Sequence, residues 1–210
     1  MNAVLKVTNI VILANNFNPA IPTKDWLMKQ GIFEKEPINF INTNVVSLFE
    51  SDDYTLEIDP QRLNYFLKKP ELFNIEYMAS SIIKYINALP ETPYTAIGYN
   101  VHWNLISAEN NKVGDFFKEN YCNNISKISS ALGSINFNFG LIISHSQSDV
   151  LITVKILPII NSTNYEIAFN FHKDLKNKNE NNKDIKEFLN NLSQYYTKAK
   201  QILEDLIKGG

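Results

Sequence analysis

The side chains best able to do chemistry are polar residues that alternate with apolar ones along strand-like segments. Two such segments carry histidine among asparagines, and the candidate ligand-binding residues are Asn100, His102, Asn104, Asn170 and His172. Histidine titrates near neutral pH and readily binds metals, so two imidazoles could form an acid/base couple or a metal pair. Two residues after His172, an aspartate at position 174 would share its face of a strand and could orient the ring. If these segments are neighbours, their polar side chains form one surface that could bind a polar ligand or a protein.

A plainer explanation of this pattern is an antiparallel sheet with one face in water, because such a sheet displays polar side chains whether or not they bind anything. A catalytic site needs groups such as a nucleophile, a base and a charge-stabilising donor at defined distances from one another, and two histidines alone do not supply such a set. Nor does any Cys/His set in the sequence have zinc spacing. We therefore predict no catalytic residue, no metal and no cofactor.

Other sources of chemistry are weaker. Ser144, a possible nucleophile, is next to His145, a possible base, in the sequence. Consecutive side chains of a strand point to opposite faces of the sheet, so these two would not meet. Cys122 is the only cysteine, which excludes an internal disulfide, fits a reducing compartment and suggests a structural thiol. Seven glycines form no phosphate-binding pattern.

The amino-acid composition limits the classes of partner that we expect this protein to bind. The formal net charge is -2, so no global field attracts nucleic acid or an anionic membrane, and we do not expect nucleic acid as a partner. No window approaches the roughly 20 apolar residues of a membrane span, and the first residues do not form a signal peptide. We expect a cytoplasmic protein.

The elements that must position the polar residues are strands. Alternation over 135–143, 150–156 and 165–171, with short breaks at 146–149 and 161–164, predicts an antiparallel meander with one apolar face. His145 is in register with Ile143, so we expect it to be partly buried at the end of a strand.

The remaining chain predicts further strands and two strong helices. The expected strands cover 4–14, 37–50, 54–58, 63–67 and 94–106, the segment 63–67 being ambiguous between strand and helix. A short helix over 24–30 would begin at the N-cap Thr23, and the first strong helix would follow Asn74 and end before Pro90. A further short helix is expected near 113–119, with a looser segment over 123–132.

The expected fold is a single α+β domain over 1–210. It consists of a curved, mainly antiparallel sheet of about seven strands with two main helices packed on one face. A polar linker over 176–183 precedes a long C-terminal helix over 184–208. The apolar stripe of that helix is wider than a coiled-coil seam, so it could cover the sheet or join a subunit interface through Leu192, Tyr196 and Leu203.

The order of elements resembles a sporadically distributed family of uncharacterised bacterial proteins. The parallels lie between Val45 and Leu206: a strand ending in the turn at Asp59 and Pro60, an amphipathic helix, a Gly-Tyr-Asn strand at 98–100, the meander and a C-terminal helix. The resemblance implies no enzyme activity. More distantly, the layout of a meander followed by a long helix is similar to that of the export chaperone SecB.

We therefore expect a non-catalytic cytoplasmic protein-interaction module. It would be an adaptor, a chaperone-like factor or an accessory subunit, for example of a defence or mobile-element operon. We expect it to bind a protein partner, a second copy of itself, or both, and to form a homo-oligomer. The alternative is a small-ligand-binding protein or an enzyme that uses the Asn/His-rich sheet face.

Overall fold

The computed structural model describes residues 1–70, 75–106, 112–133, 139–160, 162–176 and 180–208. These residues form the predicted α+β fold, with nine strands and six helices where about seven strands and two main helices were expected. The strands are β1 (Asn2–Ala14), β2 (Asn39–Asn42), β3 (Ser47–Glu50), β4 (Tyr54–Ile58), β5 (Arg62–Leu67), β6 (Tyr94–Ile106), β7 (Leu141–Gln147), β8 (Val150–Pro158) and β9 (Tyr165–Asp174). The helices are α1 (Lys24–Lys29), α2 (Ile75–Ala88), α3 (Lys112–Tyr121), α4 (Ile125–Leu132), α5 (Asn181–Asn190) and α6 (Leu192–Lys208).

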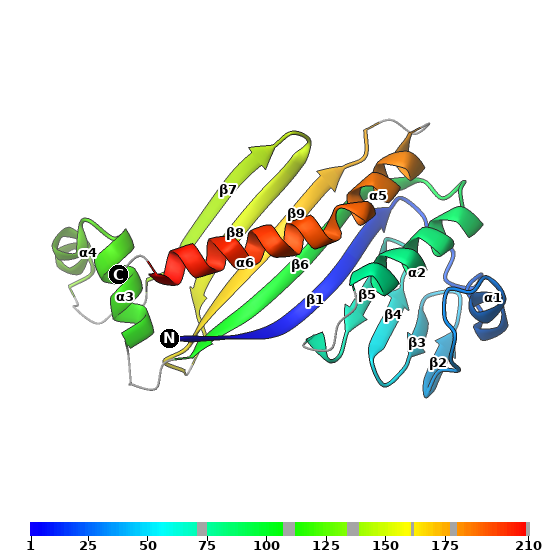
Figure 1. The fold of residues 1–210 in the computed structure, drawn as a ribbon, viewed down its shortest axis with the longest axis horizontal. Helices are drawn as coiled ribbons and strands as arrows, with labels where there is room; N and C mark the ends of the chain where they lie inside the picture. Colours follow the sequence, from blue (N-terminus) through cyan, green and yellow to red (C-terminus); the bar gives the residue numbers. More distant parts are fainter. Residues whose placement is uncertain (71–74, 107–111, 134–138, 161, 177–179, 209–210) are drawn as a thin grey trace.

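The nine strands form one sheet in the order β2-β3-β4-β5-β1-β6-β9-β8-β7, and every neighbouring pair is antiparallel (Figure 1). The strands β1 and β6, each 13 residues long, lie side by side at its centre. The ambiguous segment 63–67 belongs to β5, so the preference for a strand there is confirmed.

The topology repeats across the β1–β6 pair. Each half of the chain begins with a long central strand, leaves the sheet through one or two helices and re-enters it at an outer edge. The following strands form a meander back to the centre, where the last strand pairs with the first, and a helix follows. In the first half these elements are β1, α1, β2 to β5 and α2; in the second half they are β6, α3, α4, β7 to β9 and α5. The sequence showed no repeat of solenoid period, and this similarity is one of layout.

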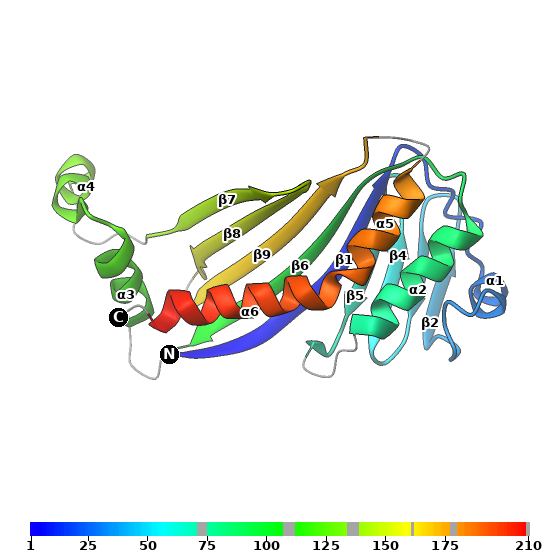
Figure 2. The ribbon, with the colours of Figure 1, turned by 45° about the horizontal axis from the view of Figure 1, so that its top comes forward.

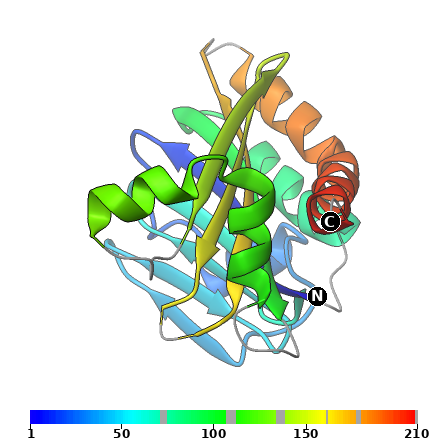
Figure 3. The ribbon, with the colours of Figure 1, turned by 90° about the vertical axis from the view of Figure 1, so that its left-hand side faces the viewer.

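Three helices cover one face of the sheet. Helices α2, α5 and α6 lie together on that side, and α6 crosses the C-terminal half of the sheet (Figures 1 and 2). Figure 3, viewed from the end that carries α3 and α4, shows α5 and α6 to one side of β7 and β8. We call the opposite face, which α2, α5 and α6 do not cover, the helix-free face.

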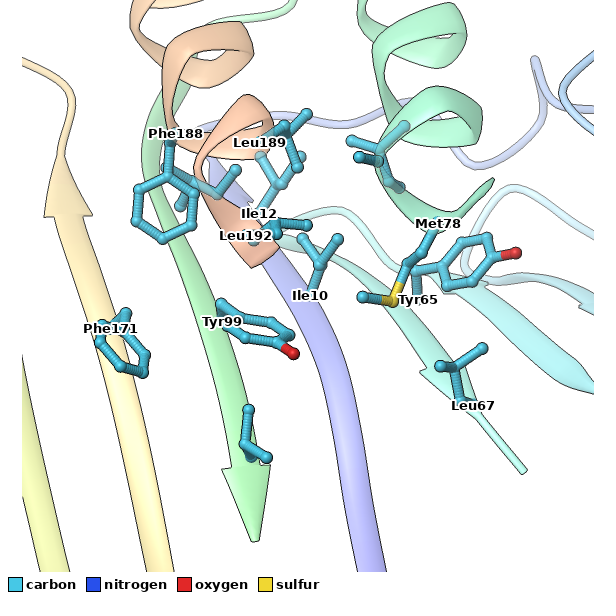
Figure 4. Packing of buried hydrophobic residues seen from close by; sticks show 14 of the residues in the cluster. Ile10, Ile12, Tyr65, Leu67, Met78, Tyr99, Phe171, Phe188, Leu189 and Leu192 are labelled. Atoms are coloured by element: carbon cyan, nitrogen blue, oxygen red, sulfur yellow. The ribbon is translucent and has the colours of Figure 1, made fainter. Parts of the chain in front are cut away.

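The core fills the space between the three helices and the sheet. Alternate residues of β1 and β6, such as Ile10, Ile12 and Tyr99, point toward the helices and are fully buried (Figure 4). Phe188 and Leu189 of α5 meet them from the helical layer. Burial of apolar side chains at about 25 cal/mol per Å² is the main force that holds the helices on this face.

Two expected elements are divided in the structure. The predicted strand 37–50 is a hairpin of β2 and β3, because the Thr43 hydroxyl accepts the backbone N–H groups of Val45 and Val46 and stabilises a tight turn. The predicted C-terminal helix 184–208 begins earlier, at Asn181, and is broken at Asn191. The carbonyl of Asn191 accepts from the first turn of α6, and its side chain caps α5 by donating to the carbonyl of Glu187.

A local signal in the sequence correctly predicted where α1 begins. The Thr23 hydroxyl accepts the backbone N–H of Trp26 at 3.2 Å, which confirms the predicted N-cap of α1. The looser segment 123–132 contains α4, and α3 packs on the end of α6, where the Tyr121 hydroxyl donates to the carbonyl of Leu206 at 3.1 Å. The predicted N-cap Asn74, residues 135–138 of the first meander strand and residues 177–179 of the linker lie outside the described residues.

Candidate functional site

Polar side chains form a row across the whole helix-free face. Successive register pairs join one residue from each of the nine strands, and eight of the nine residues are polar. In sheet order this cross-sheet row is Asn39, Glu50, Thr55, Phe66, Asn9, Asn100, Asn170, Thr153 and Ser144.

Several members of the cross-sheet row are hydrogen-bonded to one another. Nδ2 of Asn170 donates to Oδ1 of Asn100 at 2.8 Å, and the hydroxyls of Ser144 and Thr153 lie 3.3 Å apart. Nδ2 of Asn9 donates to Oδ1 of Asn64 on β5 at 2.8 Å. Side chains that bond across strands have fixed positions, so the row is an ordered surface.

The structure brings the five predicted ligand-binding residues onto two adjacent strands. Asn100 is directly opposite Asn170, and His172 is opposite Gly98 in the same β6–β9 pair. All five side chains lie on the helix-free face, as the alternation predicted, since the intervening residues are buried under the helices.

The two histidines do not form a pair. His102 and His172 lie on opposite sides of the Asn100–Asn170 pair, and each bonds a different carboxylate. Nδ1 of His102 is 2.7 Å from Oε1 of Glu166, and Nε2 of His172 is 2.9 Å from Oδ1 of Asp174. Each carboxylate can orient its own ring, which for Asp174 is the role that the sequence suggested.

The His172 ring is hydrogen-bonded to Asp174, and among the described residues no hydrogen bond joins it to a serine, threonine or cysteine. Ser146 lies in the same cross-strand register, but Leu151 separates the two residues on the intervening strand. Their backbones are therefore two strand spacings, or about 9–10 Å, apart. His145 is exposed and not partly buried as expected, because β7 is the last strand of the sheet. Cys122, a free thiol, is partly buried.

An ion-pair cluster lies where the β7–β8 hairpin meets α5. Lys173 of β9 is only 7% exposed, and its Nζ lies 2.5 Å from Oδ2 of Asp149 and 3.2 Å from Oδ1 of Asp184. Burial alone would lower the pKa of Lys173, but its hydrogen bonds to the two carboxylates outweigh this effect and raise it. The same hydrogen bond from Lys173 holds the pKa of Asp149 below its usual value. Lys173 is therefore a fixed cation at this end of the sheet.

Two open cavities adjoin this cluster, and Asp149 and Lys173 line both. The larger, of about 530 Å³, also has His172 and Asp174 in its wall. The smaller, of about 240 Å³, lies between the hairpin and the helices α5 and α6. Of the five predicted ligand-binding residues, only His172 lines either cavity.

The predicted interface residues of the C-terminal helix have a different place. Leu192 is 0% exposed and Leu203 is 3% exposed, because α6 packs them against the sheet of its own chain. Tyr196 is half-buried with its ring 6.0 Å from that of Trp103. Of the two roles expected for the apolar stripe, Leu192 and Leu203 have the first, covering the sheet, and their side chains are inaccessible to a second subunit while α6 stays in this position.

Sequence reasoning missed the partners that neighbouring strands supply. The two-residue period places Glu166 on the same face as Asn170, but its bond to His102 depends on the β6–β9 register. Asn9, Thr153 and Ser144 enter the cross-sheet row for the same reason. The spacing of residues within one strand gives the face of a side chain and does not give the residue opposite it.

Within the described part of the chain, no three His, Cys, Asp or Glu side chains gather closely enough to hold a metal ion. No helix among those residues has the length and apolar character needed to cross a membrane. No protein-family model, curated protein or solved structure matches the chain. The family resemblance drawn from its motifs therefore stays a prediction.

Proposed function

We propose that this protein is a non-catalytic interaction module, an adaptor or accessory subunit, whose helix-free face docks a folded protein. The observation that carries the proposal is the cross-sheet row, in which eight of the nine strands contribute a polar side chain and three neighbouring pairs of these side chains are hydrogen-bonded. A site for a small molecule instead gathers its polar groups around one point in a concave pocket.

The size of the row favours a protein over a small molecule. Eight strand spacings of about 4.8 Å make the row about 38 Å long. A standard protein interface buries about 800 Å² on each partner, which corresponds to a patch of about 28 Å across. Part of the row is therefore sufficient for a folded partner.

The chemistry of the cross-sheet row and its flanks indicates a partner surface with both polar and apolar groups. The row has one charged member, Glu50. Exposed apolar side chains flank it on the same face: Leu13, Ile41, Ile142, Leu151 and Leu157. Such a mixture is typical of non-obligate interfaces. A cytoplasmic location and a role in a defence or mobile-element operon are parts of this proposal.

The proposal is tested by capture of partners with two matched variants. Thr153→Arg inserts a long cation into the row, and Gln201→Arg makes a similar change on the exposed side of α6. We expect a partner that co-purifies in a fixed ratio with the wild type and with Gln201→Arg, and is lost with Thr153→Arg. Retention of that partner by Thr153→Arg, or the absence of any such partner, overturns docking on this face.

The cavity of about 530 Å³ favours a second candidate, the binding of a small polar ligand. His172 and Asp174 supply an oriented imidazole, and Lys176 supplies a cation in the same wall. The same wall carries four carboxylates, those of Asp149, Asp174, Glu180 and Asp184, so the charge of the ligand is left open. A screen of small polar molecules, both anionic and cationic, by thermal unfolding tests this candidate. An increase in melting temperature that His172→Ala abolishes would support it, and no increase with any of the molecules would contradict it.

A further inference from the structure

The outer strand β7 is an edge of the sheet formed by the described residues. Among the described residues no strand pairs with its outer side, and its register with β8 runs without a bulge from Leu141 to Gln147. Natural proteins block such edges with charges, proline, bulges or very short strands. The seven residues of β7, LIISHSQ, contain no proline and no Lys, Arg, Asp or Glu.

The opposite edge of the sheet has the protection that β7 lacks. Strand β2 has only four residues, and Pro37 stands just before it. Nδ2 of Asn42 at its end donates to the carbonyl of Pro19, which brings the segment before α1 against this edge. The two edges of one sheet therefore differ in their readiness to pair.

The turn between β7 and β8 fixes which backbone groups of β7 point outward. Ser148 and Asp149 form a two-residue loop, so Gln147 and Val150 close the hairpin as a hydrogen-bonded pair. Hydrogen-bonded and non-hydrogen-bonded pairs alternate in an antiparallel ladder. Ile142, Ser144 and Ser146 therefore direct their N–H and C=O groups away from β8.

The fold holds this edge in place. Lys198 of α6 donates to the side chain of Gln147 at the end of β7, and the ion pair of Asp149 with Lys173 fixes the adjoining turn. A strand that is already ordered loses little conformational entropy when another strand pairs with it.

We propose that β7 pairs antiparallel with β7 of a second copy of this chain, about a two-fold axis at Ser144. In this register Ser144 faces its own equivalent and Ile142 faces Ser146, so all three outward residues of each copy find hydrogen-bonding partners. Ile143, 43% exposed, would lie opposite His145 on the helix side. An uncharged strand places no like charges opposite each other, and a two-fold interface must be self-complementary in this way.

A second copy would extend the candidate docking surface. Residues opposite each other in an antiparallel pair have side chains on the same face, so the two sheets would form one sheet of 18 strands with a continuous helix-free face. A seven-residue pairing is smaller than a standard interface of about 1,600 Å². We therefore expect a dimer whose population depends on protein concentration.

The test compares the mass in solution of the wild type and two matched variants. Ile142→Lys places a charge on the outer edge of β7, and Ile38→Lys does the same beside β2, with exposed fractions of 60% and 62% in the unchanged protein. By light scattering from about 5 to about 500 μM, a range that brackets weak association, the wild type and Ile38→Lys should rise toward twice 24.1 kDa. Ile142→Lys should stay at the mass of one chain.

A second variant keeps the test independent of the added charge. Ser144→Pro removes one outward N–H without touching the ladder to β8, because proline is tolerated where the N–H of an edge strand faces solvent. It should fold, as circular dichroism can show, and stay monomeric. A wild type that is monomeric throughout overturns the proposal, and so does a dimer that survives both β7 substitutions. Binding of an extended peptide by a monomeric wild type would instead assign this edge to another chain.

Discussion

Asn170 and Asn100 lie directly opposite each other on β9 and β6, and the Nδ2 of the first donates to the Oδ1 of the second at 2.8 Å. The bond spans the strand pair that carries all five residues predicted as a ligand site. Because the two amides bond each other across neighbouring strands, their positions on that face are fixed.

A double-mutant cycle can measure this bond. We expect Asn100→Ala and Asn170→Ala to be coupled by about 0.5–1.5 kcal/mol in the free energy of unfolding, the range for one hydrogen bond. Urea denaturation of the two single variants and the double variant gives the coupling. As a control, Asn100→Ala and Thr55→Ala, distant members of the same row, should be additive within about 0.5 kcal/mol. Additivity of the two asparagine substitutions would contradict the bond.

Leu203 should act as a core residue. Leu203→Ala leaves a cavity under α6 and should destabilise the protein by about 2–5 kcal/mol. Leu132→Ala on α4, where the leucine is exposed, should change the free energy of unfolding by less than about 0.5 kcal/mol. If the Leu203 variant is as stable as the wild type but has lost its ability to self-associate, the leucine belongs to a subunit interface after all.

Lys173 should be important for the stability of the hairpin region. Lys173→Met keeps the aliphatic stem but leaves Asp149 and Asp184 without their shared cation. Breaking a fully buried pair costs about 3–5 kcal/mol, but Asp149 is largely exposed, so we expect about 1–3 kcal/mol. Denaturant unfolding checks the value, and Lys176→Met, an exposed neighbour, should have almost no effect.

Stability should fall in acid through the same cluster. The pKa of Asp149 is lower in the folded protein than in the unfolded chain, where it is about 3.9, because Lys173 donates a hydrogen bond to it. Its contribution is therefore complete above that value and is lost as the pH falls through the folded pKa. The pKa of Glu50 is lowered by hydrogen bonds from Lys68 and Asn39, with the same sign. Unfolding midpoints should thus decrease between about pH 5 and pH 2, and less steeply for Lys173→Met; equal slopes would argue against the link.

Ser148→Gly should stabilise the protein. Ser148 has a φ of 55° and is the only described residue other than glycine with a positive φ, as the first central position of a type II′ turn requires. Glycine adopts this conformation without steric cost, so we expect a gain of about 0.5–1 kcal/mol. Ser146→Gly in the extended part of β7 should instead lose a similar amount. Thermal unfolding of both variants would separate the two effects, and a loss at both positions would mean that Ser148 is not strained.

Elements with a strong local signal were predictable from the sequence. The alternation of Val150, Ile152 and Val154 predicted β8, and the spacings of three and four among Ile75, Met78 and Ile82 predicted α2. The break at Asn191 was not predictable, because the apolar stripe continues through it and only the packing of two helices on one sheet requires the kink. The hairpin inside 37–50 was missed because Thr43 stabilises its turn without glycine or proline.

The candidate site was predictable only within each strand. The face of His102 and of Asn170 followed from the two-residue period. The order of strands did not, since β1 and β6 are separated in the sequence by residues 15–93. Without that order neither the cross-sheet row nor the bond of His102 to Glu166 could be derived.

The repeated topology bears on how the protein forms during synthesis. The strands from β1 to β5 can pair as soon as they leave the ribosome, since all their partners except β6 precede residue 68. Until β6 arrives, the 13-residue edge of β1 remains unsatisfied and Ile10 and Ile12 lack the cover of α5. A nascent chain that stalls in the loop between α2 and β6 would therefore expose a long strand edge whose unpaired backbone groups can bind other chains. Such an intermediate would need a ribosome-associated chaperone to prevent aggregation.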